Sequence, residues 1–337
     1  MKERLIIPKN YEDPFDVFNT QKAIKLVKDS FETELAKNLN LSRVSAPLYV
    51  TKASGLNDNL SGVERPVAFE IACLPDEEIE IVQSLAKWKR LALKIYDFWQ
   101  DKGLYTDMNA IRRDEVLDNL HSNYVDQWDW EKVIDRSQRN IAYLKETVIK
   151  IVRALKATEY QLIGKYPQLT SLIAADVFFI TAQELLDKYP NLDPKEREYK
   201  ICKEYKTVFI LQIGEKLTNG LPHDNRAPDY DDWQLNGDLL VYYPLLDCAV
   251  ELSSMGIRVD EKSLLTQLEK AQANERLSLP YHQMLAKGQL PLTIGGGIGQ
   301  SRICLVLMHK AHIGEVQVSL WPQAMVTACQ ENNIHLL

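Results

Sequence analysis

The chain has 337 residues, of which 45% are hydrophobic and 26% are charged, a balance typical of a globular protein rather than of a disordered chain. No apolar run approaches the roughly 18 residues that a membrane-spanning helix requires, so no membrane partner is expected. The formal net charge of -7, without any lysine or arginine run longer than two, argues against nucleic acid as a partner and favours small-molecule substrates.

The first predicted element is a long amphipathic helix over residues 15–39, where apolar side chains recur mostly three or four positions apart. The segment 43–50 is rich in β-forming residues and contains Pro47, which suits an edge strand or a strand end. The next predicted elements are strands over 66–74 and 78–82 and a helix over 84–102.

Two further strands, 104–113 and 122–130, precede a second long helix over 137–165. A charged, turn-rich region at 187–205 leads to a β-branched strand over 207–213. The last third is predicted to hold a strand at 238–243, helices at 261–272 and at 274–288 with an interruption at Pro280, a glycine-rich segment at 293–302 and a helix at 303–310. Strands tend to adjoin strands without a βαβ alternation, which predicts an α+β fold with a mostly antiparallel sheet.

A glycine-rich segment precedes the last predicted helix. Gly295, Gly296, Gly297 and Gly299 are followed by Gln-Ser-Arg302. Glycines let the backbone approach a ligand closely, and a helix start favours an anion. The segment fits neither common glycine-rich nucleotide motif. Taken alone, a tight turn with Arg302 in a surface salt bridge explains it equally well.

Two arginines, Arg112 and Arg113, end the predicted strand over 104–113. An arginine fork suits a phosphate because it binds two oxygens and stays charged. In isolation, solvated turn charges are the simpler interpretation.

Acidic residues concentrate in the last third, at 229–232, Asp238 and Glu251. Two or three converging carboxylates could hold Mg²⁺ against the phosphates of ATP. A solvated acidic surface is the ordinary alternative. Asp238 opens an apolar strand and Glu251 lies in an apolar stretch, which favours a pocket for both.

Polar residues also stand in apolar company earlier in the chain. Asp58 follows a glycine-bearing turn, and Ser84, Lys87 and Arg90 are each about one helical turn apart. Alternation in the predicted strand places Asp126, Trp128 and Trp130 on one face and Gln127, Asp129 and Glu131 on the other. Spacing alone leaves open whether these acids face a pocket or solvent.

Several other classes of protein are disfavoured. The histidines show no helical zinc-binding pair, and no G-x-S-x-G element of an α/β-hydrolase occurs. The segment from Met1 to Pro8 has no secretory signal, so a cytoplasmic location is expected. The five cysteines form no Cys-x-x-Cys pair and are expected to be reduced core thiols.

Longer stretches carry a combined pattern: Asp58-Asn-Leu-Ser-Gly62, Ser84-Leu-Ala-Lys-Trp-Lys-Arg90, Tyr124-Val-Asp-Gln-Trp-Asp-Trp130, Arg226-Ala-Pro-Asp-Tyr-Asp-Asp-Trp233, Glu251-Leu-Ser-Ser-Met-Gly-Ile-Arg-Val-Asp260 and Thr293 to Arg302. In this order they resemble the ammonia-dependent asparagine synthetases, a family with the catalytic fold of class II aminoacyl-tRNA synthetases. The similarity runs from about Asn19 to Trp321. It implies a central antiparallel sheet flanked by helices, a single catalytic domain over 1–337, and a homodimer that contacts through the first helix (about 14–40) and the Pro47 strand.

The resemblance implies a ligase that forms asparagine from L-aspartate and ammonia through β-aspartyl-AMP, converting ATP into AMP and pyrophosphate. Arg112 would hold the α-phosphate, and Arg302 would close the glycine-rich element against the nucleotide. Asp238 and Glu251 would bring Mg²⁺ to the phosphates. Further nucleotide contacts are implied for Ser253, Ser254 and Arg258.

Around aspartate and ammonia, the resemblance places Asp58, Ser84, Lys89, Gln127, Asp129 and Asp231. Lys89 suits the α-carboxylate and Asp129 the α-ammonium group. Asp58 suits a role in holding ammonium and accepting its proton before attack. The residues predicted to be catalytic are Asp58, Arg112 and Arg302.

The sequence departs from the family between Trp233 and Asn236. Only Gln234 and Leu235 intervene where the family usually has a longer loop. A lid over the nucleotide is the element that this shortening would affect.

Two other functions share part of the pattern. An aspartyl- or asparaginyl-tRNA synthetase would use the same adenylation chemistry but adds an anticodon-binding barrel, for which no room is expected before residue 15. A catalytically inactive amino-acid-binding paralogue would not need Arg112, Glu251 and Arg302. A glutamine-dependent enzyme is disfavoured because it commonly uses an N-terminal cysteine, and Cys73 is the earliest here.

Overall fold

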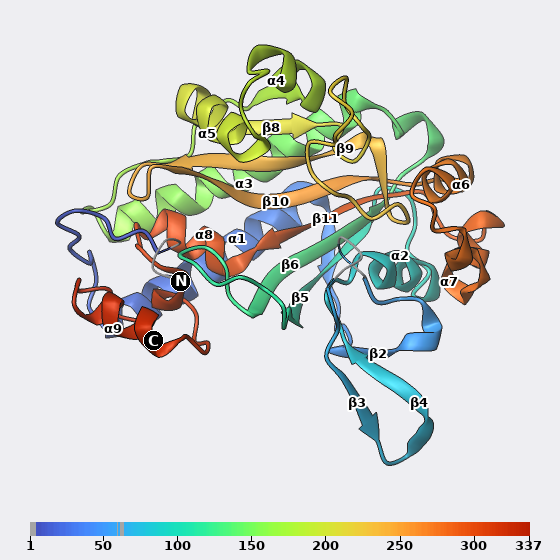
Figure 1. Ribbon diagram of the computed structural model, residues 1–337, viewed down its shortest axis with the longest axis horizontal. Coiled ribbons are helices and arrows are strands. Elements are labelled where there is room, and N and C mark those ends of the chain that lie inside the picture. Colours follow the sequence, from blue (N-terminus) through green and yellow to red (C-terminus); the bar gives the residue numbers. More distant parts are fainter. Residues whose placement is uncertain (1–4, 59, 61–63) are drawn as a thin grey trace.

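A large mixed sheet runs through the centre of the computed structural model, which describes residues 5–58, 60 and 64–337 (Figure 1). Within those residues the sheet has eight strands, and only the outermost pair at each edge is parallel. In spatial order the strands are β1 (Leu41–Arg43), β5 (Gly103–Ile111), β6 (Tyr124–Val133), β11 (Thr293–Gly299), β10 (Cys248–Arg258), β9 (Asp231–Tyr243), β8 (Thr207–Leu211) and β7 (Phe178–Thr181). The predicted α+β class with a mostly antiparallel sheet is confirmed.

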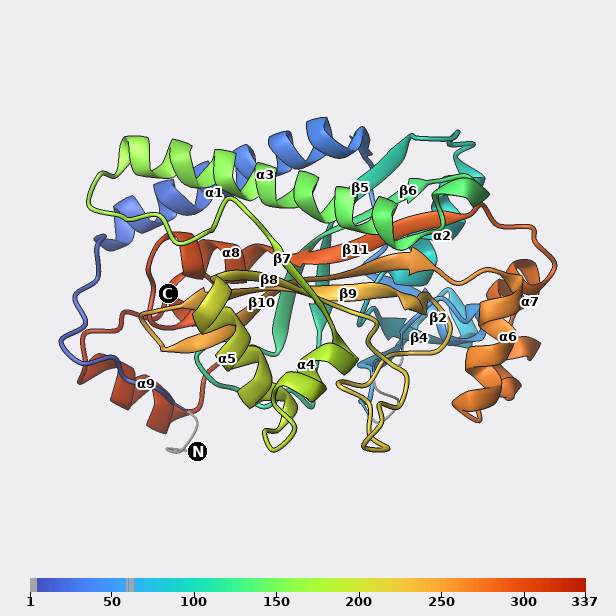
Figure 2. The ribbon, with the colours of Figure 1, turned by 90° about the horizontal axis from the view of Figure 1, so that it is seen from above.

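Two long helices, α1 (Val17–Leu39) and α3 (Ile141–Lys165), lie side by side across one face of this sheet (Figure 2). The predicted helix over 15–39 is confirmed, and it begins where the Asp16 carboxylate accepts the Asn19 N–H at 2.7 Å. The predicted helix over 137–165 starts slightly later, after an Asn140 cap. The short helix α8 (Gln300–Leu307) packs under α1.

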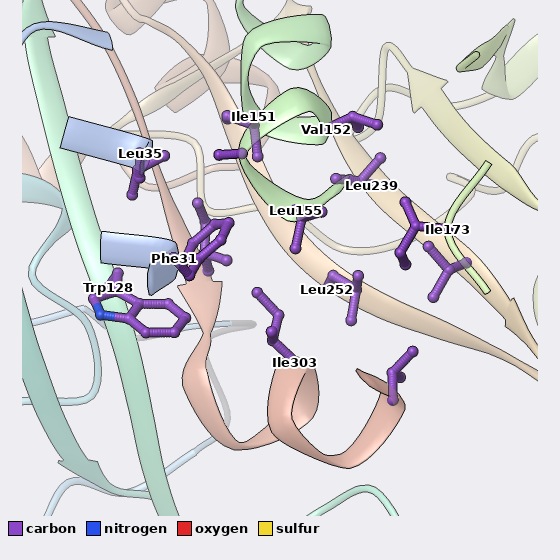
Figure 3. Close-up of a cluster of buried hydrophobic side chains, with 14 of the residues drawn as sticks. Phe31, Leu35, Trp128, Ile151, Val152, Leu155, Ile173, Leu239, Leu252 and Ile303 are labelled. Carbon is purple, nitrogen blue, oxygen red and sulfur yellow. The ribbon is translucent and has the colours of Figure 1, made fainter. Parts of the chain in front are cut away.

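The main hydrophobic core fills the space between these helices and the sheet (Figure 3). Phe31 of α1 packs against Trp128 of β6 with ring centroids 4.7 Å apart, and Trp130 is also fully buried. Asp126, on the same strand face, pairs with Lys28 of α1. The predicted face of Asp126, Trp128 and Trp130 is therefore the face toward α1.

The opposite face of the sheet is covered only in part. The helix α2 (Ala86–Ile95) packs on β6, and α5 (Pro194–Tyr205) packs on β10 and β9, with α4 (Ala182–Lys188) beyond it. Figure 2 shows α4 and α5 across the sheet from α1 and α3. The remaining helices, α6 (Glu261–Lys270), α7 (Pro280–Ala286) and α9 (Gln323–Gln330), lie toward the two ends of the molecule.

A second, smaller sheet projects from the body as a long hairpin (Figure 1). Its strands are β2 (Tyr49–Thr51), β4 (Leu74–Ile81) and β3 (Ala68–Ile71). The prediction of one strand over 43–50 is wrong, because the chain leaves the main sheet after Arg43 and joins the small sheet only at Tyr49. Pro47 lies in this crossing, where its missing N–H breaks no ladder.

Three other predictions differ from the structure. The helix predicted over 84–102 ends at Ile95, and Asp97 adopts a left-handed φ of 55° that turns the chain. The region 187–205, predicted as turns, contains α5. In the helix predicted over 274–288, the first part is a 3₁₀-helix (Asn274–Ser278) rather than an α-helix. The interruption expected at Pro280 is the start of α7, because proline fits the first helical position.

The short segment at Gln234 and Leu235 lies inside β9 rather than in a loop. Asn236 pairs with Gly256 and Asp231 with Arg258, so residues 232–235 bulge out of register against β10. The segment between Trp233 and Asn236 is thus part of a strand bulge in this structure.

Candidate active site

A cavity of about 360 Å³ opens on the sheet face that α2 and α5 leave partly uncovered. Its floor comes from β6, β10 and β11, and its walls from α2, the segment after β5, and the long segment 212–230 that leads into β9. The structure brings most of the predicted site residues to this cavity: Asp58, Ser84, Lys89, Arg112, Gln127, Asp129, Asp231, Glu251, Ser253, Ser254, Arg258 and Arg302. Asp238 is the exception.

Arg258 anchors the floor of the cavity. Its guanidinium donates to both carboxylate oxygens of Glu131, at 2.7–3.1 Å, and to Asp231. All three side chains are at most 3% exposed. Burial alone would raise the pKa of Glu131, but the charge and hydrogen bonds of Arg258 outweigh it and lower that pKa. A buried guanidinium held from two sides gives the site a fixed geometry.

Lys89 and Asp129 form a second buried pair next to this anchor. The Lys89 ammonium donates to Asp129 Oδ1 and, at 2.8 Å, to the carbonyl oxygen of Gly296. Burial lowers the pKa of Lys89 against the opposing charge of Asp129. Asp129 Oδ2 is buried and accepts no hydrogen bond from any described residue. An unsatisfied buried carboxylate oxygen is costly, so this atom is available to a cationic ligand group.

Asp58 lies in the cavity wall and is only 1% exposed. Its Oδ1 accepts the Leu60 N–H at 2.9 Å, while Oδ2 has no hydrogen-bond donor among the described residues. Burial raises its pKa although the charge of Lys87 opposes the shift. The other polar members of the Asp58–Gly62 motif, Asn59 and Ser61, lie outside the described residues, as does Gly62.

Some residues around α2 line the cavity, whereas others bind neighbouring parts of the protein. Ser84 lines the cavity, and its hydroxyl accepts the Ala86 N–H at 3.1 Å. Arg90 instead faces the framework, where it donates to the carbonyl oxygens of Val259 and Pro291 at 2.7 and 2.8 Å. Lys87 lies 3.4 Å from Asp229. The even spacing of Ser84, Lys87 and Arg90 therefore does not mark one binding surface.

Arg112 and Arg302 both line the cavity, although they lie far apart in the sequence. Arg112 follows β5, and its Nε–H is buried without an acceptor among the described residues. Arg302 in α8 donates to the carbonyl oxygen of Glu251 at 2.9 Å. Ser253 links β10 to β11 in the cavity floor, since its hydroxyl donates to the Gly297 carbonyl at 3.0 Å. Two guanidinium groups on one cavity suit an anionic ligand.

Asp238 on β9 is buried and Glu251 on the adjacent strand β10 is half-buried, and only Glu251 lines the cavity. Asp238 is paired with Arg226 instead. Burial raises the pKa of Asp238 to about 7, with Arg226 opposing and the Glu251 charge adding to the shift. Burial also acts upward on the pKa of Glu251, but Arg302 and Arg226 outweigh it and lower that pKa.

Several cavity residues received no individual role from the sequence: His121, Ser122, Lys195, Asp224, Arg226 and Tyr230. Arg226 lies inside one of the stretches that carry the family resemblance. Its charge between Asp224 and Asp229 is the sequence feature that indicates a place in the site. Lys195 lies in the region predicted to be turn-rich. Only a prediction of α5 would have placed it near the site.

The arrangement suits a small ligand with charges of both signs. Asp58 and Asp129 each have a carboxylate oxygen without a donor among the described residues, which suits cationic groups, and Arg112 has an N–H without an acceptor there, which suits an anion. All are buried in one cavity, where electrostatic interactions are stronger than in water. Such a site can bind an amino acid and a phosphate compound side by side.

Comparisons with known proteins agree with this picture. The sequence matches the family AsnA, described as aspartate-ammonia ligase, over residues 18–333. It is similar to an aspartate-ammonia ligase of Clostridium perfringens, with 62% identity over 335 residues, 99% of this chain and 100% of that one. One from Pediococcus pentosaceus is 58% identical over 333 residues, 99% of each chain.

Solved structures of similar fold include class II tRNA synthetases. The asparaginyl-tRNA synthetase from Pyrococcus horikoshii complexed with asparaginyl-adenylate has a TM-score of 0.65 and 14% identity, covering 90% of this chain and 70% of that one. The aspartyl-tRNA synthetase from Entamoeba histolytica has a TM-score of 0.61 and 13% identity, over 90% of this chain and 59% of that one. These likenesses confirm the predicted fold.

Proposed function

The chain belongs to the aspartate-ammonia ligase family, and from this membership we propose that it joins ammonia to the β-carboxyl group of L-aspartate, using ATP, to form asparagine. The observation that carries the proposal is one cavity that brings together three buried groups without hydrogen-bond partners in the described ranges: a carboxylate oxygen of Asp58, one of Asp129, and the Nε–H of Arg112. An aspartate zwitterion and a nucleotide phosphate need these complementary groups.

Aspartate would bind over the buried pairs on the cavity floor. The free Oδ2 of Asp129 would accept the α-ammonium group, and Lys89 would bind the α-carboxylate. Arg258 is already held by Glu131 and Asp231, so it loses little conformational freedom when substrate arrives. Gln127 and Ser84 complete the lining.

In the first step, an oxygen of the β-carboxylate would attack the α-phosphorus of ATP. The bond from that phosphorus to the bridging oxygen breaks, so pyrophosphate leaves and β-aspartyl-AMP forms. Arg112 and Arg302 would stabilise the negative charge that builds on the phosphate oxygens. Burial of the cavity floor would keep water away from the mixed anhydride, because water would otherwise hydrolyse it.

In the second step, the nitrogen of ammonia would attack the activated carbonyl carbon, and the bond to AMP breaks. Ammonium must lose a proton before its nitrogen can attack. Asp58 has a buried carboxylate oxygen that no described residue contacts as a donor, and its pKa is raised, so it would bind ammonium and accept that proton.

Mg²⁺ would bind together with ATP, and the carboxylates of Asp238 and Glu251 are suitable ligands for it. Burial and the neighbouring Glu251 charge raise the pKa of Asp238, although Arg226 opposes the shift, so a cation between these acids would relieve their repulsion. The described residues contain no group of three or more side chains placed to bind a metal. Mg²⁺ commonly uses one or two carboxylates with substrate phosphates, and we therefore propose Asp238 and Glu251 as its ligands. The bound ion would neutralise phosphate charge, and Arg226 would release Asp238.

The decisive experiment is aspartate-dependent exchange of labelled pyrophosphate into ATP, with and without ammonium, followed by chromatography for asparagine. The proposal expects exchange whenever aspartate is present, and asparagine only when ammonium is added. Exchange with tRNA charging and no asparagine would support a tRNA synthetase instead. Aspartate binding without exchange would support an inactive binding protein.

A further inference from the structure

Lys195 lines the cavity, although neither the sequence pattern nor the steps above give it a role. It lies in the first turn of α5, and its ammonium is close enough to Glu251 for their charges to interact. We propose that Lys195 binds the terminal phosphates of ATP, and hence the pyrophosphate product, at the mouth of the cavity. This inference rests on the proposed ATP-dependent function.

The ammonium group of Lys195 is held in place despite its exposure. The side chain is 72% exposed, but its Nζ lies 2.9 and 3.2 Å from the two carboxylate oxygens of Glu198. Glu198 is buried and is contacted at 3.2 Å by His223, which is 1% exposed. An exposed lysine pair alone adds little stability. Here a fixed acceptor orders a side chain that would otherwise sample many rotamers.

Glu198, three residues along the helix, is the structural partner of Lys195, but the place of this lysine in α5 also suits an anionic ligand. The helix begins at Pro194 after an Asp193 cap, so Lys195 is its second residue. The amino-terminal end of a helix carries partial positive charge, which disfavours a lysine there. An anionic ligand at this place would interact favourably with both the lysine and the helix end.

A second observation indicates an anionic ligand in the same part of the cavity. Arg226 pairs with Asp238 through one terminal nitrogen, but its Nε–H is buried and has no acceptor among the described residues. Arg226 and Lys195 come from different elements and both interact electrostatically with Glu251. Acids also surround this place: partial desolvation acts to lower the pKa of Lys195, but the charges of Glu198, Glu251 and Asp224 outweigh it and raise that pKa. The lysine therefore stays charged.

The acids with which they interact distinguish this cation from the one assigned to the α-phosphate. Arg112 interacts electrostatically with Asp58, at the amino-acid end of the cavity, whereas Lys195 interacts with Glu251 and Asp224. When the α-phosphorus is attacked, negative charge grows on the departing pyrophosphate. A cation at the mouth would stabilise this leaving group. It would equally stabilise the reverse reaction, in which pyrophosphate attacks the adenylate to form ATP again.

The test compares Lys195→Met with Lys200→Met in the full-length enzyme. Lys200 is an exposed lysine on the same helix and does not line the cavity, so it controls for charge and for changes in α5. Michaelis constants for pyrophosphate, ATP and aspartate are measured in the exchange reaction. K195M should raise the constants for pyrophosphate and ATP about five- to tenfold and leave that for aspartate within about twofold.

Two more variants separate binding from positioning. Lys195→Arg keeps the charge and should recover most of the pyrophosphate affinity. Glu198→Gln frees the ammonium and should raise the pyrophosphate constant about threefold, again without changing the aspartate constant. If K195M matches K200M while the wild type exchanges normally, the role of Lys195 is refuted and the proposed function stands. If the wild type shows no exchange, both are refuted.

Discussion

The buried acids of the cavity differ in how far neighbouring cations neutralise them. Glu131 and Asp231 share Arg258, and Asp129 bonds to Lys89. Within the described part of the chain, the Asp58 carboxylate accepts only the Leu60 N–H, and burial raises its pKa. It is therefore the acid best placed to exchange a proton during the reaction.

Replacing Asp58 should separate the two half-reactions. In Asp58→Asn the carboxylate that accepts the proton is lost, whereas the groups assigned to aspartate and ATP remain. We expect pyrophosphate exchange to persist and asparagine formation to fall by about 10²–10⁴-fold. Asp76→Asn, in the exposed hairpin strand β4, is the matched control. Asparagine formation by D58N at the rate of the wild type would remove Asp58 from the mechanism.

The pH profile gives an independent test of the same residue. Only the ionised carboxylate can accept a proton, and the Asp58 pKa is raised by burial. Asparagine formation should therefore decline with acidification at a pH above the ordinary aspartate value of about 3.9. The rate of asparagine formation is measured at saturating ammonium and aspartate between pH 4 and 9, at intervals of about one pH unit. An unchanged acidic limb in the residual activity of D58N would assign that limb to another group.

Single residues also show what the sequence could predict. It selected acids and arginines that meet in one cavity, because the recognised stretches carry them together. It could not predict that Lys89 and Asp129 pair with each other, or that Asp238 turns to Arg226, because spacing along the chain does not specify partners from other strands. Contacts of this kind depend on tertiary packing.

Among the elements, the glycine-rich strand β11 has the tightest packing requirement. A Cβ at Gly295 would lie 1.9 Å from a carboxylate oxygen of Glu131, and one at Gly297 would lie 2.3 Å from the side-chain oxygen of Gln127. At Gly299 the nearest atom is 3.3 Å away, in the Arg302 side chain. The first glycines are thus required by neighbouring polar side chains, whereas Gly299 is not.

Alanine substitutions in β11 should therefore differ sharply. Gly295→Ala would push Glu131 from Arg258 and leave a buried ion pair broken, which costs about 3–5 kcal/mol. Gly299→Ala should cost less than about 1 kcal/mol. The free energy of unfolding is measured by urea denaturation at one protein concentration. Equal unfolding midpoints for the two variants would show that the Glu131–Arg258 pair does not depend on the glycine.

Long periodic elements were predictable, and short or polar ones were not. The helices at 15–39 and 137–165 were found because each buries a continuous apolar stripe. The helix α5 was missed because its surface is highly charged, although Asp193, Pro194 and Glu196 form a recognisable helix start. Strand β10 was not identified either, although Glu251 in its middle was selected.

At the scale of the whole molecule, exposed apolar side chains occur in the two segments that the resemblance assigns to a dimer contact. Val17 and Phe18 at the start of α1 are 55% and 67% exposed, and Leu48 and Tyr49 near β2 are 50% and 45% exposed. Exposed apolar residues in such segments are typical of protein interfaces. None of the helices in the described ranges is long and apolar enough to cross a membrane.

We propose that these segments pair two copies of the chain. Sedimentation velocity should then give a mass of twice 38.7 kDa at micromolar concentration. Phe18→Asp and Leu48→Asp would place charges in the contact and should shift the mass to that of one chain, because an unpaired buried charge is costly. Leu265→Asp, at a 48% exposed site on α6, should leave the dimer intact. A wild-type protein that sediments as a single chain at all concentrations would refute the dimer, whereas a dimer unaffected by both substitutions would place the contact elsewhere.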